Sequence, residues 1–129
     1  MRRAAWAFVP ALAYAAIIFW LSAQSDPLPF LPPELFLHDK LLHAAEYAVL
    51  GGLLVPALRL AGLNPRTALL AAVVIASAYG AGDEFHQSFV PGRNADVADW
   101  LADTAGSAIG AAIGAAVATA FLRRPSRAG

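Results

Sequence analysis

The sequence predicts an all-α protein, a four-helix transmembrane bundle with both termini on the cytoplasmic side. Of its 129 residues, 59% are hydrophobic and only 14% are charged, whereas a soluble domain carries about 25% charged residues. Four stretches are apolar and approach the length of about 20 residues that a helix needs to cross a bilayer. The charged residues gather between these stretches or at their ends. At this length we expect one domain covering residues 1–129.

The first expected span covers residues 6–23 and contains no charged residue. Arg2 and Arg3 precede it and small residues end it, so a cleaved signal peptide is the alternative. We favour a retained membrane helix because the apolar run exceeds the about 7–15 residues typical of a signal peptide. Pro10 falls inside this span, and helices in lipid tolerate proline better than soluble helices do.

The other three expected spans cover residues 41–60, 67–84 and 97–122. Asn64 followed by Pro65 is typical of an N-cap and a first helical residue, so it predicts the start of the third span. Asp96, with Asp99 three residues later, predicts a capped start for the fourth span, with negative charge at the helix N-terminus.

The basic residues indicate the orientation of the bundle. Seven of the nine lie at the start of the chain, in or beside the turn between the second and third spans, or at the end. Because basic residues concentrate on the cytoplasmic side, both termini are expected inside. All nine acidic residues and all three histidines lie toward the opposite, outer end. The bilayer is the expected partner; no basic cluster with interleaved aromatic residues favours nucleic acid.

The second span begins with ionisable residues at helical spacing. Asp39, His43 and Glu46 are spaced i, i+4 and i+7, which places them on one face. Lys40, His43 and Tyr47 form an overlapping stripe. Ionisable groups inside a membrane normally face the bundle interior or a wet cavity. In a purely structural interpretation, Asp39 caps the helix, Lys40 reaches the interface and His43 pairs with Glu46.

The third span ends in a second polar group. Asp83 and Gln87 share a face if the helix continues, and Glu84 lies beside them. The turn at residues 91–92 allows Arg93 to fold back toward a carboxylate or a phosphate. The structural alternative is that Arg93 pairs with Asp83 or Glu84.

The fourth span carries acids and glycines on one stripe. Asp99 and Asp103 lie near its outer end, and Gly106, Gly110 and Gly114 follow. Glycines at this spacing let helices approach closely, either within the bundle or through self-association between copies. Since the acids share the stripe, we expect a polar pocket below the outer membrane surface, lined by the second, third and fourth spans.

Carboxylates beside an imidazole supply general acid–base chemistry when their pKa values are split. The same groups suit a divalent cation, but no motif with metal-ligating spacing occurs, so neither a metal nor another cofactor is predicted. A proton or ion path across the bilayer is disfavoured because the inner half of every span lacks acids and histidines.

Residues 39–50 and 79–110 resemble the VanZ-like family of small bacterial membrane proteins. The matching residues are Asp39, Lys40, His43, Tyr47, Asp83, Glu84, Gln87, Phe89, Pro91, Gly92, Arg93, Asp99, Gly106 and Gly110. Asp103 departs from the pattern, where the family is expected more often to have asparagine, so its role is in doubt. The resemblance implies a protein of the bacterial cytoplasmic membrane, connected with the cell envelope and related to teicoplanin-resistance proteins. It implies no reaction.

Two functions stay open. In the first, the outward pocket binds and modifies a lipid or cell-wall precursor headgroup. The expected acid–base residues are His43, Glu84 and Asp83, and the expected substrate-binding residues are Lys40, Arg93, Gln87, Asp39, Glu46, Tyr47 and Asp99. In the second, the same residues only stabilise the bundle of a non-enzymatic structural or interaction protein.

Overall fold

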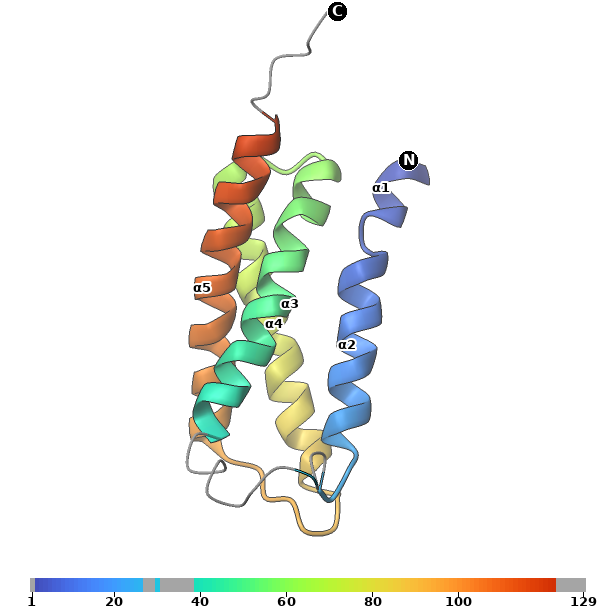
Figure 1. Ribbon diagram of the computed structural model, residues 1–129, viewed down its shortest axis with the longest axis vertical. Coiled ribbons are helices and arrows are strands. Elements are labelled where there is room, and N and C mark those ends of the chain that lie inside the picture. The colour runs from blue at the N-terminus through green and yellow to red at the C-terminus, as the bar shows by residue number, and fades with distance from the viewer. Residues whose placement is uncertain (1, 27–29, 31–38, 123–129) are drawn as a thin grey trace, which may run out of the picture.

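The computed structural model describes residues 2–26, 30 and 39–122 (Figure 1). Regular structure in these residues is helical throughout: α1 (Arg2–Trp6), α2 (Val9–Ser22), α3 (Asp39–Leu60), α4 (Pro65–Gln87) and α5 (Val97–Leu122). Four segments are long and apolar enough to cross a membrane: Ala4–Ser22, Asp39–Leu60, Pro65–Gln87 and Val97–Phe121. The expected all-α class with four membrane-capable helices is confirmed.

The first span contains a break that the sequence analysis did not anticipate. Pro10 is the second residue of α2. A proline ring clashes with the carbonyl four residues earlier, which belongs to Trp6, where α1 ends. The N–H groups of Ala7 and Phe8 donate instead to carbonyls three residues back, at 3.2 Å. Proline therefore interrupts the helix expected over residues 6–23.

The other helix ends follow local signals. The Asn64 side chain accepts a hydrogen bond from the Thr67 N–H at 3.0 Å, which confirms the expected N-cap of α4. Asp96 accepts from the Ala98 N–H at 2.8 Å and caps α5. Helix α3 begins two residues before the expected span and α4 ends three residues after it, at Gln87. Both extensions lengthen the polar ends of the helices.

Helices α3 and α5 are in backbone contact. A Cβ atom at Gly106, Gly110 or Gly114 would overlap with the main chain of Ala44, Ala48 or Gly52, respectively. The glycine stripe thus packs within the bundle, which is one of the two alternatives that the sequence left open. Self-association through these glycines stays a prediction, and it would have to use a face that α3 already covers.

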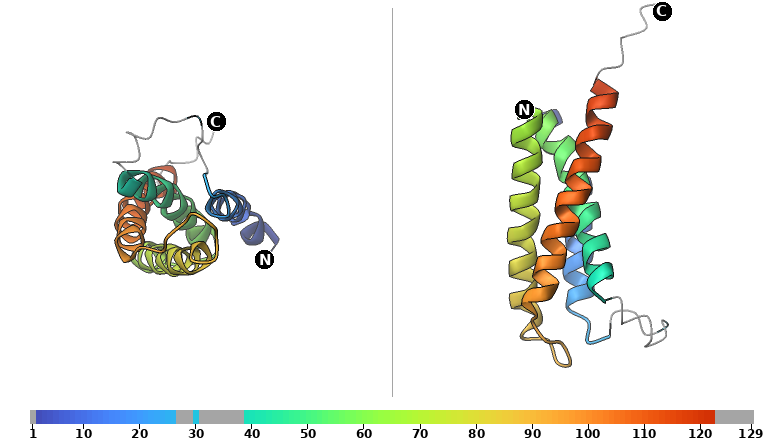
Figure 2. Two further views of the ribbon diagram at one scale, coloured as in Figure 1. Left: turned by 90° about the horizontal axis from the view of Figure 1, so that it is seen from below. Right: turned by 90° about the vertical axis from the view of Figure 1, so that its left-hand side faces the viewer.

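Helix α2 stands beside the three-helix group formed by α3, α4 and α5 (Figure 2). Two contacts join it to α4. The Tyr79 hydroxyl donates to the Ala15 carbonyl at 2.6 Å, and the Phe19 ring stacks on His86 with centroids 4.4 Å apart. The start of α1 and the end of α5 lie at one end of the bundle, and the α4–α5 connection lies at the other (Figure 1). We call the latter the polar end.

Candidate functional site

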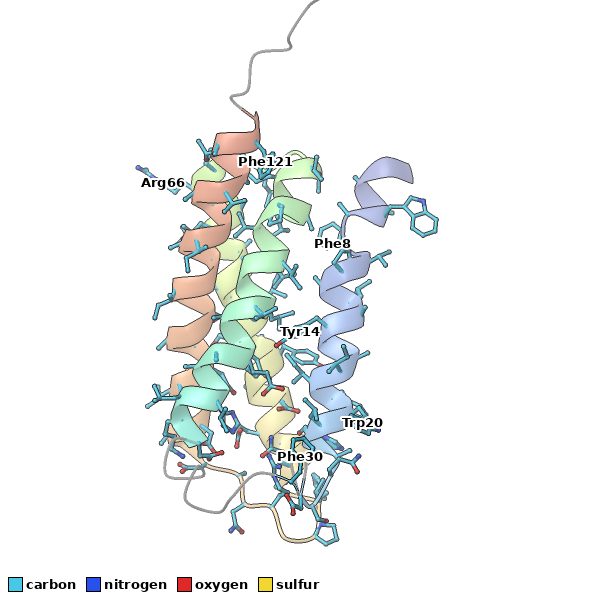
Figure 3. The ribbon with its side chains drawn as sticks, viewed as in Figure 1. Phe8, Tyr14, Trp20, Phe30, Arg66 and Phe121 are labelled. Carbon is cyan, nitrogen blue, oxygen red and sulfur yellow. The ribbon has the colours of Figure 1, made fainter. Side chains whose placement is uncertain are left out.

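Nitrogen and oxygen atoms of many side chains gather at the polar end (Figure 3). Six ionisable or amide side chains among them are less than a tenth exposed: His43, Asp83, Glu84, Gln87, Asp99 and Asp103. They come from α3, α4 and α5, the three helices expected to line a pocket. Helical periodicity explains the gathering, because each helix turns one polar face inward at the same level.

Lys40 joins the starts of α3 and α5. Its Nζ donates to Asp96 Oδ2 at 2.9 Å and also to Asp99 Oδ1, and it lies 3.9 Å from Asp39 Oδ2. The Lys40 ammonium, followed by the Ala98 N–H, holds the pKa of the Asp96 carboxyl below its usual range. Because three carboxylates surround Lys40, its charge is already compensated within the chain.

His43 pairs with an acid on α5. Its Nδ1 lies 2.8 Å from Asp103 Oδ1, and its Nε2 lies 3.7 Å from Asp99 Oδ2. The interpretation that His43 pairs with Glu46 is therefore wrong, because the imidazole points across the α3–α5 interface rather than along its own helix.

Asp103 is the polar residue whose importance the sequence analysis missed. It is fully buried, bonds to His43, and has a second oxygen, Oδ2, without a hydrogen-bond partner. Its departure from the family pattern argued against a role. The available signal was its position one turn after Asp99, which places both acids on the face of α5 that meets α3.

The acids of α4 have different partners. Glu84 Oε2 accepts a hydrogen bond from the Asp96 backbone N–H at 2.9 Å, so this side chain fixes the segment that leads into α5. The Gln87 amide donates to Asp83 Oδ2 at 3.3 Å. Glu84 Oε1 and Asp83 Oδ1 are buried without a hydrogen-bond partner.

Arg93 does not pair with Asp83 or Glu84. The ion pairs between side chains of residues 2–26, 30 and 39–122 do not include it. It is half-buried and lines a cavity together with Gly92 and Asn94. The structural alternative for Arg93 is thus wrong, and Arg93 is instead part of the cavity lining.

This cavity has a volume of about 900 Å³ and lies between α2, α3 and α4 at the polar end. Its lining includes most of the expected site residues: Asp39, Lys40, His43, Glu46, Asp83, Gln87, Arg93 and Asp99. Tyr14 and Ile18 of α2 supply an opposing wall, and Figure 3 shows Tyr14 pointing from α2 toward α3. Glu84, Asp103 and Tyr47 do not line the cavity and lie within the helix group behind it.

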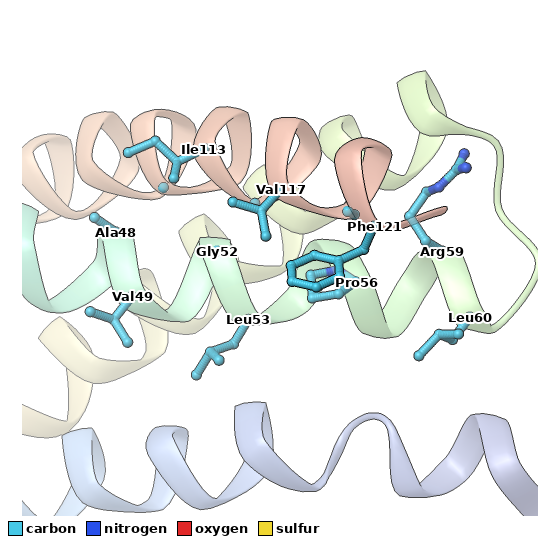
Figure 4. Close-up of a pocket in the computed structure, with 13 residues that line it drawn as sticks. Ala48, Val49, Gly52, Leu53, Pro56, Arg59, Leu60, Ile113, Val117 and Phe121 are labelled. Carbon is cyan, nitrogen blue, oxygen red and sulfur yellow. The ribbon is translucent and has the colours of Figure 1, made fainter. Parts of the chain in front are cut away.

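A second cavity of about 690 Å³ lies between α3 and α5, nearer the termini (Figure 4). Its walls are apolar, with Val49, Leu53, Val117 and Phe121 among them, and Arg59 is the charged residue at one end. The described residues that line it include no acid, imidazole or hydroxyl side chain that could carry acid–base chemistry. The candidate site is therefore the cavity at the polar end.

Two groups of side chains at the polar end are arranged to hold a metal ion. One comprises Asp39, His43 and Asp99, and the other comprises His43, Glu84 and Asp103. In each group one ligand atom per residue lies within 4.8 Å of the others. His43 belongs to both groups.

Comparison with known proteins adds one match. A family model described as VanZ/LLP1 matches residues 6–119, which include every expected site residue. No curated protein and no solved structure matches the chain.

Proposed function

The chain belongs to the VanZ/LLP1 family and is a multi-pass helical membrane protein, and we propose that its cavity at the polar end binds a lipid headgroup. The ligand class is an envelope lipid or a lipid-linked cell-wall precursor. The observation that carries this proposal is the amphipathic wall of the cavity. Leu21, Leu42 and Val49 line the same cavity as Glu46 and Arg93. A lipid headgroup with its first acyl carbons likewise combines a polar and an apolar part.

The charges on the wall favour a headgroup that contains an amine. Six carboxylates line the cavity: Asp26, Asp39, Glu46, Asp83, Asp96 and Asp99. Lys40 is bonded to two of them, so Arg93 is the cation left to face a ligand. A guanidinium binds phosphate in a fork geometry, and carboxylates attract an ammonium group. A zwitterionic headgroup, with one phosphate and one amine, therefore matches the wall better than a purely anionic one.

The location in the cell follows from charge. The positive-inside rule favours termini on the cytoplasmic side of the bacterial inner membrane, and the polar end then faces outward. An outward cavity is on the side where envelope lipids and cell-wall precursors are exposed. This placement supports a link with glycopeptide action, as the relation to teicoplanin-resistance proteins implies.

Any chemistry on the headgroup would take place at His43, because this imidazole lines the cavity and Asp103 orients it. Asp83 also lines the cavity and is a second candidate for acid–base work. Glu84 is a positioning residue in this proposal, since it holds the Asp96 backbone and does not reach the cavity.

A purely structural role is the second candidate. The bonds of Lys40 to Asp99, His43 to Asp103 and Glu84 to Asp96 all join different parts of the bundle. Arg93 makes no such bond, so its share in a structural network is limited to its charge acting on Glu46. Arg93 therefore discriminates between the two functions.

The test measures lipid binding by the full-length protein in nanodiscs. We expect phosphatidylethanolamine, which has an amine and a phosphate, to raise the unfolding midpoint more than phosphatidylglycerol, which lacks the amine. Arg93→Ala should abolish this difference while leaving the protein folded. Arg66→Ala is the matched control, because Arg66 is exposed at the other end of the bundle (Figure 3). Equal stabilisation by both lipids, or an unchanged preference in Arg93→Ala, would contradict the proposal.

A further inference from the structure

The polar side chains behind the cavity have the composition of a metal site. We infer that His43, Glu84 and Asp103 bind one divalent cation of the first transition row, Zn²⁺ or Mn²⁺, between α3, α4 and α5. Headgroup binding in the cavity is a separate property, and this inference does not depend on it.

The three residues enclose a small volume. Each comes from a different helix, and one ligand atom of each lies within 4.8 Å of the other two. His43 and Glu84 are 7% exposed and Asp103 is 0% exposed. Exposed acids are kept apart by water, whereas these are held together by helix packing. The arrangement is close enough to surround a single ion.

Unpartnered oxygens point to a missing ligand. Glu84 Oε2 and Asp103 Oδ1 have partners, the Asp96 N–H and His43 Nδ1. The second oxygens of the same carboxyls, Glu84 Oε1 and Asp103 Oδ2, are buried and have none. Burial of an unsatisfied carboxylate oxygen is costly, and buried polar groups in proteins are almost always paired. A cation bound by this group would give the two buried carboxyls a further partner.

The balance of charge also favours a cation. Four buried carboxyls lie at the polar end, those of Asp83, Glu84, Asp99 and Asp103. Lys40 bonds to Asp99 among them and does not bond to Glu84 or Asp103. The His43 imidazole carries at most one positive charge and so cannot offset all of the remaining negative charge, whereas a divalent ion held by a histidine and two carboxylates would offset most of it.

The donor set selects the class of ion. Imidazole suits Zn²⁺ and other transition ions, and Ca²⁺ and Mg²⁺ prefer oxygen ligands alone. The group formed by Asp39, His43 and Asp99 has the same chemistry but includes Lys40 as a neighbour. The Lys40 ammonium bonds to Asp99 and lies 3.9 Å from Asp39 Oδ2, so it would repel a cation bound by this group. The buried group is therefore the better site.

His43 would be a ligand through one ring nitrogen, and a carboxylate would accept the proton on the other, as is usual for metal-bound histidines. Asp103 Oδ1 lies 2.8 Å from Nδ1, so Nδ1 is the nitrogen placed to share an ion with Asp103, and Asp99 Oδ2, 3.7 Å from Nε2, is the carboxylate on the other side of the ring. A nitrogen bound to a cation does not take up a proton. The inference thus competes with the acid–base role of His43 and leaves headgroup binding untouched.

The experiment titrates untagged, EDTA-treated, full-length protein with ZnCl₂ or MnCl₂. Bound ion is counted by elemental mass spectrometry after equilibrium dialysis, and unfolding is followed by tryptophan fluorescence. We expect one Zn²⁺ or Mn²⁺ per chain and a rise in the unfolding midpoint that EDTA reverses, with no rise from CaCl₂. An absence of saturable binding, or binding that leaves the unfolding midpoint unchanged, would overturn the inference.

Variants then locate the ion. Glu84→Gln and Asp103→Asn keep the side-chain shape and should each weaken binding at least tenfold. Asp39→Asn, which changes the competing group, should bind as the wild type does, and so should Asp26→Asn, which alters an exposed aspartate. Weaker binding in Asp39→Asn with unchanged binding in Glu84→Gln would overturn the assignment. If a site variant fails to fold, the wild-type titration still decides whether an ion binds.

Discussion

Gly106 lies directly against Ala44, with no room between the two backbones for a Cβ atom. Gly110 meets Ala48 in the same way one turn later. These contacts bring α3 and α5 close enough for His43 to reach Asp103 at 2.8 Å. The glycines therefore determine the geometry of the polar end, although they contribute no chemistry to it.

We expect Gly110→Ala to lower the free energy of unfolding by about 1–3 kcal/mol, because the added methyl group overpacks the α3–α5 contact. Gly82→Ala is the matched control: Gly82 is also helical, and a Cβ there meets nothing within 4 Å. The control should be neutral or gain up to about 1 kcal/mol from helix propensity. Thermal unfolding in detergent measures both, and equal stability of the two variants would refute the close packing.

Lys40→Met should lower the free energy of unfolding by about 1–3 kcal/mol, since it removes a charged hydrogen bond to Asp99, which is 5% exposed. Lys40 itself is half-exposed, so we expect less than for a fully buried pair. Lys40→Arg keeps the charge and should recover part of the loss. The check is chemical or thermal unfolding of the three proteins side by side; full stability of the methionine variant would contradict the role given to Lys40.

Acid should remove the contribution of Asp96 to the free energy of unfolding. Its pKa is lowered from 3.8 by the hydrogen bond from Lys40 and then by the Ala98 N–H. Between the lowered pKa and the usual one, the unfolded chain binds more protons than the folded chain, so stability falls as pH falls. The contribution is complete above the usual pKa and is lost below the lowered one.

The measurement compares wild-type protein with Asp96→Asn from about pH 5 to about pH 2.5, a range that brackets the usual aspartate value. The wild type should be more stable at the upper end, and the difference should shrink toward the lower end. Asp26→Asn, at an exposed aspartate, controls for general acid effects. A difference that is constant with pH would disprove the coupling to Lys40.

Single cysteines test the orientation, because the chain contains none. Ser25 and Asn94 line the cavity at the polar end, and Asn64 caps α4 at the other end. All three are exposed. In intact cells, an impermeant thiol reagent should label Ser25→Cys and Asn94→Cys but not Asn64→Cys. Labelling of Asn64→Cys alone would show that the orientation is the opposite of the one expected.

Local signals in the sequence predicted most of the helix positions and helix ends. Apolar length gave the spans, and Asn64 and Asp96 act as the expected caps. Pro10 was read as tolerable, but its ring acts on the carbonyl of Trp6 and breaks the first span. That helices in lipid generally tolerate proline does not determine whether a helix continues through one particular proline.

Pairing between helices was harder to predict. Spacing placed His43 and Glu46 on one face of α3, yet His43 bonds to Asp103, sixty residues away. Arg93 was expected to reach a carboxylate or a phosphate, and the alternative partners, Asp83 and Glu84, form no ion pair with it among the described residues. Periodicity fixes which face a residue occupies, whereas the rotation and height of the neighbouring helix fix its partner. These two quantities depend on the close α3–α5 contact.

Helices α3, α4 and α5 are bonded to one another at the polar end through Lys40, His43 and Glu84, and none of these bonds involves α2. Helix α2 is tied to α4 by a hydroxyl at Tyr79 and a ring at His86. A sideways displacement of this one helix would widen or close the cavity while the acid–imidazole network stayed intact. Capture and release of a ligand from the bilayer would then require the opening of this hydrogen bond, this ring stack and the packing of α2 against α3 and α4.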